Sequence, residues 1–412
     1  MELLDGRWQI GGCDVLALCD KYSTPVYVYD TAKMRERYET LKQAFAGTRM
    51  SIKYACKALT NPAVLRFFRS LGAGVDTVSV QEVRMALEAG FEPQAILFTP
   101  NCVAFEEIRQ AVELGVHVNI DNIPTLERFG DVYGGTVPVC IRINPHIMAG
   151  ANPNISVGHI DSKFGISIHQ MRHVRRVVES HGIHVNGIHM HTGSDILSID
   201  SFVRAAEVLF DYAEMFPRLD FVDFGSGFKV AYREGDVTTN VAELGRQLTP
   251  LFNDFCERYG RELELWFEPG KFLVSEAGAF LVEVNVIKQT PAAVFAGVNS
   301  GMNHLIRPMF YDAYHHIVNV SNPDGPPRIY TVVGYICETD TFGLDRNLNE
   351  VREGDILAFN NAGAYGISMA SNYNSRLRPA EVLVHEGRDY LIRRRETFED
   401  LTRCLESSDL QF

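Results

Sequence analysis

Lys57 follows a strand-like segment and could act as a nucleophile. Ile52, Tyr54 and Cys56 alternate with other residues at the period of a strand, and turn-prone residues follow at 60–62. Lys57 is therefore expected at the carboxyl end of a strand. A lysine in a partly dry pocket has a lowered pKa and can form a Schiff base. A solvated lysine at a strand end is the alternative interpretation.

Two histidines and a serine follow a second strand-like segment. His189 and His191 stand at i and i+2, so they share one face of a strand. A metal site is not favoured, because no third ligand stands at a suitable spacing. We expect His191 to stack on a flat cofactor ring and Ser194 to help bind a phosphate, whereas His189 is expected to be a hydrogen-bonded core residue.

A glycine-rich turn and a carboxylate end two further segments. Gly225-Ser226-Gly227 would let backbone N–H groups approach a phosphate closely, or it is an ordinary turn. Glu268 emerges from an apolar segment, and a buried carboxylate needs a partner. That partner is either a protonated pyridine nitrogen or Lys271. Cys337-Glu338 could supply a proton donor and a cation anchor, although a buried cysteine is more often inert packing.

The elements that carry these residues alternate between short apolar segments and helical patterns. Alternation of this kind indicates a parallel sheet, and eight units indicate a closed (β/α)8 barrel, a TIM-like fold. We expect the barrel to cover residues 25–285. The expected strands are Ser51–Cys56, Gly74–Val78, Ala95–Thr99, His117–Ile120, Val137–Asn144, Val185–His191, Phe221–Phe224 and Glu264–Phe267.

The remainder of the chain has a different pattern. Strand-like segments at 282–287, 329–333, 355–359 and 381–384 are separated by Gly, Pro and Asn. We therefore expect a mostly β second domain made of residues 1–24 and 286–412, which includes an N-terminal strand near Arg7.

Active-site residues of such barrels lie at the carboxyl ends of the strands. The expected strands end in one lysine, several carboxyl and amide side chains, one histidine, the glycine turn and a glutamate beside a lysine. In chain order these residues are Lys57, Asp76, Asn101, Asp121, Asn144, His191 with Ser194, Gly225 to Gly227, and Glu268 to Lys271. The sequence therefore predicts one site at this end of the barrel.

Composition excludes several classes of protein. The 412 residues carry a net charge of -13, which argues against nucleic acid as a partner. No apolar run is long enough to span a membrane, and the N-terminus lacks a secretory signal pattern. The eight cysteines are scattered without a CxxC pair. These features predict a cytoplasmic protein with reduced thiols.

Taken together, the motifs resemble the fold-type III pyridoxal-phosphate-dependent decarboxylases over nearly the whole chain. The segments that carry the resemblance are Tyr54-Ala55-Cys56-Lys57-Ala58, His191-Thr192-Gly193-Ser194, Phe224-Gly225-Ser226-Gly227, Glu268-Pro269-Gly270-Lys271, Ile306-Arg307-Pro308 with Tyr311, Cys337-Glu338, Gly363-Ala364-Tyr365 and Ser368 to Arg376. The last segment is similar to the branch of the family that converts meso-diaminopimelate to L-lysine and carbon dioxide.

The resemblance implies a role for each matched residue. Lys57 would hold pyridoxal 5'-phosphate covalently, His191 would stack on its ring and Glu268 would pair with the ring nitrogen. Ser194, Gly227, Gly270 and Tyr365 would bind the phosphate. The remaining residues that we assign to the cofactor site are Asp76, Gly225, Ser226, Pro269 and Lys271.

The same resemblance implies a substrate site and a homodimer. Cys337 is expected to be the catalytic acid, and it would reach in from the second subunit together with Glu338. Arg307 and Tyr311 would bind the distal carboxylate of meso-diaminopimelate, and Lys271 and Tyr365 would also contact substrate. No metal, nucleic acid or membrane is expected.

The chain departs from the family pattern at three positions. Lys271 stands where the family usually has arginine, Ser226 replaces a more common glycine, and Thr339 replaces serine. Alternative functions are decarboxylation of another basic amino acid or of carboxynorspermidine, or an inactive regulatory protein; alanine racemase is more remote. Arg307 distinguishes diaminopimelate from these other substrates, because diaminopimelate has a distal carboxylate that needs a cation and ornithine has none.

Overall fold

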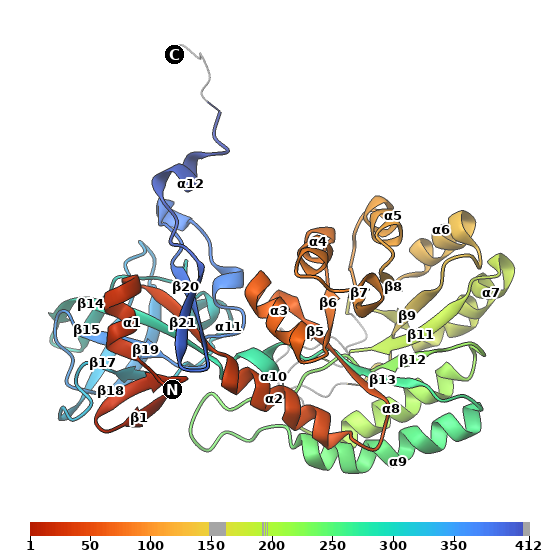
Figure 1. The fold of residues 1–412 in the computed structure, drawn as a ribbon, viewed down its shortest axis with the longest axis horizontal. Helices are drawn as coiled ribbons and strands as arrows, with labels where there is room; N and C mark the ends of the chain where they lie inside the picture. Colours follow the sequence, from red (N-terminus) through yellow and green to blue (C-terminus); the bar gives the residue numbers. More distant parts are fainter. Residues whose placement is uncertain (148–161, 192, 194, 196, 407–412) are drawn as a thin grey trace. The chain divides into compact units, whose positions relative to one another are not determined.

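A computed structural model describes residues 1–147, 162–191, 193, 195 and 197–406, and its internal contacts divide the chain into two units (Figure 1). Unit 2 comprises residues 35–231 and 235–273, and unit 1 comprises residues 1–34, 232–234 and 274–412. Ser194 lies outside the described residues, so its predicted role at a phosphate has no structural counterpart here.

Unit 2 is the predicted (β/α)8 barrel. Its eight parallel strands are β5 (Met50–Ala55), β6 (Gly74–Thr77), β7 (Ile96–Phe98), β8 (His117–Ile120), β9 (Val139–Asn144), β11 (Val185–Met190), β12 (Phe221–Asp223) and β13 (Glu264–Phe267). Each strand pairs with the next, and β13 pairs with β5, which closes the barrel. The short β10 (Ile166–Ser167) adds to β9. All eight strands expected from the sequence are confirmed.

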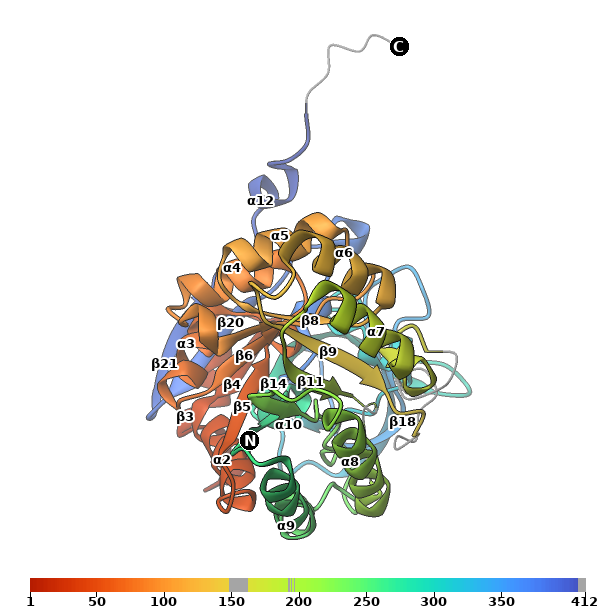
Figure 2. The same ribbon diagram turned by 90° about the vertical axis from the view of Figure 1, so that its right-hand side faces the viewer.

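The longer helices of unit 2 lie outside the ring of strands (Figure 2). These outer helices are α2 (Thr31–Ala44), α3 (Pro62–Ser70), α4 (Val80–Glu88), α5 (Phe105–Glu113), α6 (Ile123–Tyr133), α7 (Met171–His181), α8 (Ile199–Ala213) and α9 (Val241–Tyr259), whereas the short α10 (Lys271–Val274) follows β13 and is not part of the outer ring. α3 shows why these segments are helical: the Asn61 side chain caps the first turn, Pro62 occupies the first helical position, and an apolar face is buried. Such helices cover the outer face of the strands.

Unit 1 is mostly β. Its large sheet contains β4 (Val26–Asp30), β14 (Gly278–Gln289), β15 (Val294–Val298), β17 (Pro327–Val333), β18 (Thr341–Asn349), β20 (Ala380–His385) and β21 (Arg388–Arg393), with β16 (Ile317–Asn319) and β19 (Ile356–Phe359) attached through β14. The remaining elements are β1 (Glu2–Leu4), β2 (Arg7–Ile10), β3 (Cys13–Asp14), α1 (Val15–Tyr22), α11 (Arg307–Tyr311) and α12 (Phe398–Thr402).

The bounds of the two units differ from those of the predicted domain division. The division predicted from sequence began the barrel at residue 25 and ended it at 285, but β4 pairs with β14 and β20 in the sheet of unit 1. The strand near Arg7 also lies in unit 1, although it pairs with β1 and β3 in a separate three-stranded sheet. Ile10 of β2 and Val15 and Leu18 of α1 pack in the same buried cluster as Val26 and Val28 of β4.

Candidate active site

The site in unit 2 begins where β5 and β13 end side by side. Lys57 lies in a single turn of 3-10 helix, 56–58, directly after β5. The Ala55 N–H donates to the carbonyl of Pro269 at 3.2 Å, and the Glu268 N–H donates to the carbonyl of Gly225 at 2.7 Å. Backbone hydrogen bonds therefore hold three of the predicted loops together at one end of the barrel.

Lys57 forms an ion pair with the carboxyl group at the end of β6. Its Nζ lies 2.8 Å from Asp76 Oδ2, and the Asp76 side chain is fully buried whereas Lys57 remains accessible. Burial raises the pKa of Asp76 to about 7, with the charge of Glu268 adding to the effect and Lys57 opposing it. Asp76 can therefore hold or release a proton beside the amine near neutral pH.

Glu268 is a buried carboxylate held by a histidine. His189 Nε2 lies 3.0 Å from Glu268 Oε2, whereas Oε1 is buried without a hydrogen-bond partner among the described residues. Burial alone would raise the pKa of Glu268, but His189 and Lys57 hold it at about 2. Burial also lowers the pKa of His189, so we assign a neutral His189 that donates from Nε2 to an ionised Glu268.

His191 is a neutral ring that supports the glycine turn. Burial and then the charge of Arg142 lower its pKa to about 3, and its Nδ1 accepts the Ser226 N–H at 3.2 Å. Gly225 has a φ of +59°, and a Cβ there would lie 2.7 Å from His191 Nδ1. Only glycine fits between the ring and the turn at this position. Gly227 also has a positive φ, and Gly270 packs against Ala55 and Ala58.

Lys271 is paired with a different carboxylate from the one considered in the sequence. Its Nζ lies 2.5 Å from Asp195 Oδ1, and both side chains are largely buried. Glu268 instead contacts His189, so the alternative of a Glu268–Lys271 salt bridge is not found in the structure. His189 was predicted to be a hydrogen-bonded core residue, and its complete burial and this contact confirm that prediction.

Unit 1 holds the other predicted residues, beginning with a buried arginine. Arg307 is 7% exposed, and its Nη2 donates to Tyr232 Oη at 3.3 Å. Its guanidinium also lies over the rings of Tyr232 and Tyr311, at 5.4 and 5.9 Å from their centroids. No carboxylate pairs with Arg307 among the residues that the structure describes, and its buried Nε has no hydrogen-bond partner there. A buried guanidinium in this setting suits an anionic ligand.

Cys337 and Glu338 are exposed side by side on unit 1. Asn374 Nδ2 lies 3.1 Å from the Cys337 sulfur, and Tyr373 Oη donates to Glu338 Oε1 at 2.8 Å. The Ser368–Arg376 segment therefore orients the predicted acid and the predicted cation anchor. Tyr365 is half-buried and has a φ of +55°.

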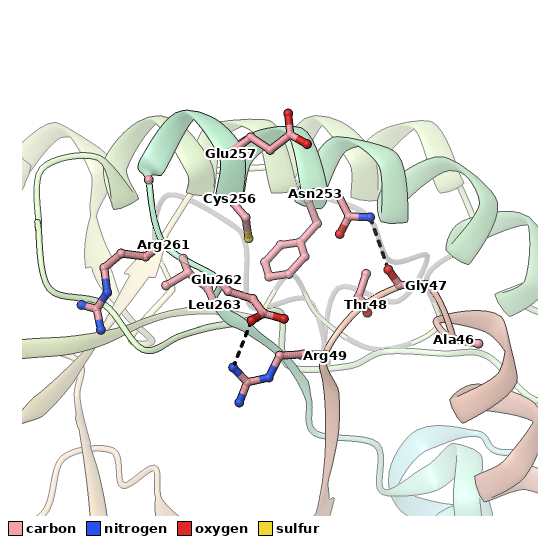
Figure 3. A pocket seen from close by; sticks show the side chains of 12 residues that line it. Ala46, Gly47, Thr48, Arg49, Asn253, Cys256, Glu257, Arg261, Glu262 and Leu263 are labelled. Atoms are coloured by element: carbon pink, nitrogen blue, oxygen red, sulfur yellow. Dashed lines mark hydrogen bonds and ion pairs between the residues drawn. The ribbon is translucent and has the colours of Figure 1, made fainter.

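A cavity of about 690 Å³ lies elsewhere in unit 2 (Figure 3). It is lined by residues that precede β5 and β13, such as Arg49 and Glu262, so it lies at the amino ends of the strands. Both of its arginines already have acid partners: Arg49 contacts Glu262 and Glu264, and Arg261 contacts Asp220. In barrels this end contributes to stability, so the cavity is not the candidate site.

Three residues of these clusters were not predicted from the sequence. Arg142 and Asp223 are buried charged residues in β9 and β12, and Tyr232 contacts Arg307. A charged residue inside an apolar strand was a usable signal for the first two, because burial without a partner is costly. Tyr232 carried no such signal, since its partner is 75 residues away.

Comparison with known proteins identifies the family. Residues 31–275 match the model of the pyridoxal-dependent decarboxylase family, pyridoxal binding domain. The chain belongs to the pyridoxal-dependent decarboxylase family. It is 41% identical to the diaminopimelate decarboxylase of Methanothermobacter thermautotrophicus and 36% identical to that of Bacillus subtilis, in each case over 97% of this chain and 95% of the relative.

Solved structures agree with this assignment. The crystal structure of Methanocaldococcus jannaschii diaminopimelate decarboxylase in complex with L-lysine matches with a TM-score of 0.91 and 33% identity, over 99% of this chain and 98% of that one. The chain is therefore a pyridoxal-phosphate-dependent carboxy-lyase of the diaminopimelate decarboxylase group.

The residues of unit 2 fit this cofactor. Lys57 supplies an accessible amine, and the unpartnered Oε1 of Glu268 belongs to an ionised carboxylate that suits a protonated ring nitrogen. His191 supplies a neutral ring. Because Gly225 has no Cβ, the backbone of the turn can lie close to that ring. The chemistry of this set of residues matches a pyridinium ring with a carbonyl and a phosphate. Pyridoxal 5'-phosphate is the cofactor of this chain.

Proposed function

We propose that the chain decarboxylates meso-2,6-diaminopimelate to L-lysine and carbon dioxide, as a cytoplasmic homodimer with Cys337 and Glu338 supplied across the subunit interface. The names of the relatives and the L-lysine bound to the Methanocaldococcus jannaschii enzyme support this substrate. In this chain, the observation that carries the proposal is Arg307, a buried cation without a carboxylate partner among the described residues. No helix among the described residues has the length and apolar character needed to span a membrane.

The residues of unit 2 hold and tune the cofactor. Lys57 Nζ would bind it covalently, Asp76 would exchange a proton with that amine, and His191 would support one face of the ring. Ser194, Gly225, Ser226, Gly227, Pro269 and Gly270 would bind the phosphate, and we expect Tyr365 of unit 1 to contribute to the same role. When bound, pyridoxal 5'-phosphate supplies a sink for the electron pair released when carbon dioxide leaves the α-carbon.

Glu268 stabilises the charge on which that sink depends. Its carboxylate stays ionised in a buried site, so it can hold a proton on the ring nitrogen. Lys271 is held by Asp195, so its ammonium sits beside the phosphate loops as one half of an ion pair. We expect it to act on the phosphate side, and to contact substrate less directly than the bidentate arginine usual at this position.

The residues of unit 1 select the substrate and finish the reaction. Arg307, flanked by Tyr232 and Tyr311, binds the distal carboxylate, and Glu338 binds the distal ammonium. Cys337 delivers the proton that replaces carbon dioxide on the α-carbon. Substrates without a distal carboxylate leave Arg307 buried and unpaired, which disfavours them.

The test is carbon dioxide release from meso-diaminopimelate, L-lysine and L-ornithine. We expect wild type to favour diaminopimelate. Arg307→Ala should raise its KM about 10- to 100-fold, because a charge-assisted hydrogen bond contributes about 1.5–3 kcal/mol. Arg307→Lys keeps the charge without the planar guanidinium group, so its KM should lie between those of wild type and Arg307→Ala.

Either of two results would remove the basis of the proposal. One is a wild-type preference for lysine or ornithine. The other is an Arg307→Ala variant that keeps the wild-type preference, since the distal carboxylate would then be read elsewhere.

A further inference from the structure

The barrel interior contains a carboxyl group that the reaction described above does not use. Asp223, the last residue of β12, is fully buried. Its Oδ1 accepts the Gly225 N–H at 2.8 Å. Its Oδ2 is buried, and no hydrogen bond of regular geometry reaches it from the described residues. Such an atom is costly to bury, so its protonation state needs an explanation.

Asp223 lies close to Glu268 and His189. One side-chain nitrogen of His189 and one carboxyl oxygen from each of Asp223 and Glu268 all lie within 4.8 Å of one another. Two ionised carboxylates at this separation in a buried site repel strongly. One of the two therefore carries a proton.

The surroundings decide which of the two is neutral. Glu268 accepts a hydrogen bond from His189, and its ionised form is favoured by Lys57. Asp223 has no ion pair among the described residues. Burial, followed by the charge of Glu268, raises the pKa of Asp223 well above its usual value. The proton therefore resides on Asp223.

We propose that Asp223 is a positioning residue that works as a neutral acid: its protonated carboxyl group faces Glu268 and, together with His189, fixes that carboxylate for the ring nitrogen of the cofactor. The proposal rests on the role proposed above for Glu268. A carboxylate has about four lone-pair sites, so hydrogen bonds from His189 and Asp223 leave sites for the ring nitrogen. The Gly225 N–H ties the same aspartate to the turn beside His191.

Two variants of similar size separate this role from an ionised Asp223. Asp223→Asn keeps an acceptor for the Gly225 N–H and a donor toward Glu268, as a protonated aspartate does. Asp223→Leu keeps the approximate volume but removes both. The dissociation constant of pyridoxal 5'-phosphate, measured by equilibrium dialysis, should stay within about threefold of wild type for Asp223→Asn and rise about 10- to 100-fold for Asp223→Leu.

A second measurement on the holoenzyme needs no substrate. The infrared difference spectrum of wild type minus Asp223→Asn should contain a C=O stretching band of a protonated carboxyl group that shifts in D₂O. If Asp223→Leu does not fold, wild type and Asp223→Asn alone decide the outcome.

Three results would overturn the proposal. The first is the absence of the carboxyl band. The second is a dissociation constant for pyridoxal 5'-phosphate that rises at least tenfold in Asp223→Asn. The third is a stoichiometric metal ion that is bound to wild-type holoenzyme and is missing from Asp223→Asn. These measurements do not depend on diaminopimelate. A failure of the proposed substrate would therefore appear only in the carbon dioxide assay.

Discussion

Two lysines lie four residues apart, Lys53 within β5 and Lys57 in the turn directly after it, and their surroundings differ. Lys57 is accessible at the carboxyl end of β5 beside Asp76, whereas Lys53 is buried over the ring of Trp266, with its Nζ 3.8 Å from the centroid. Burial lowers the pKa of Lys53 to about 8, so its amine is nucleophilic too. Position rather than basicity decides which lysine can meet a cofactor.

We therefore expect borohydride reduction to fix the cofactor on Lys57 alone. Lys57→Ala should lose the bound-cofactor absorbance near roughly 420 nm and all covalent labelling, because no other amine is placed to react. Lys53→Met is the matched control and should be labelled as wild type. Peptide mapping that found the label on Lys53 in the Lys57→Ala variant would refute the assignment.

Among individual residues, the sequence predicts best those site side chains that lie at the ends of strands. Lys57 and Glu268 were predictable because a polar residue that ends an apolar run in a barrel faces the site. Asp223 and Arg142 were overlooked: each is a charged residue in an apolar strand, but the residues that surround it come from other strands. A linear sequence does not show which buried charges meet.

The turn after β12 is an element whose shape depends on one glycine. Gly225→Ala would place a methyl group 2.7 Å from His191 Nδ1 and force an alanine to a φ of +59°. The backbone conformation costs about 1–2 kcal/mol, and the clash displaces either the turn or the ring. We expect the cofactor dissociation constant to rise more than about tenfold. The corresponding loss of binding free energy is comparable with the cost of the backbone conformation.

Gly260→Ala is a control that has the unfavourable positive φ without a steric clash. Gly260 follows α9 with a φ of +77°, and a Cβ there meets nothing within 4 Å. This control should lower the free energy of unfolding by about 1 kcal/mol and leave cofactor affinity unchanged. Equal losses of affinity in both variants would show that the turn does not depend on its contact with His191.

Elements were predicted best where the sequence pattern is strong. The eight barrel strands are short buried runs between amphipathic helices, and their order in the chain is their order in the barrel. β4 has an equally apolar pattern, but alternation does not reveal a partner, and its partners are β14 and β20. β15, β16, β18 and β21 were missed because strands with mixed exposure carry little hydrophobic periodicity.

The stability of the whole protein should depend on pH through Lys53. Its pKa is about 8 in the folded state and 10.5 in the unfolded chain. Between these values the unfolded state binds more protons, so the free energy of unfolding rises with pH from about 8 and levels off above 10.5. Relative to Lys53→Met, wild type should gain up to about 3 kcal/mol over that window.

Denaturant unfolding of both proteins at pH 7, 8, 9 and 10 provides the measurement. The ring of Trp266 favours the charged amine, so it reduces the size of the gain. If the free energy of unfolding changes with pH in the same way in both proteins, then burial does not disfavour the charged form of Lys53.

The proposed dimer can be tested by combining two defective chains. If Cys337 acts across the interface, a hybrid of Lys57→Ala and Cys337→Ala has one site with both defects and one intact site. A doubly tagged, purified hybrid should then show about half the wild-type activity, although each parent is nearly inactive. A hybrid as inactive as its parents would place Lys57 and Cys337 of one site in the same chain.

The path of the chain also has a consequence for its biosynthesis. β4 leaves the ribosome early, but its neighbour β20 follows only about 350 residues later, after the whole barrel has been made. At about 5–20 residues per second, the apolar β4 waits for tens of seconds with an unpaired edge. Incomplete chains that stop before residue 380 keep that edge open, so premature termination late in translation should yield aggregation-prone products even though every barrel residue is present.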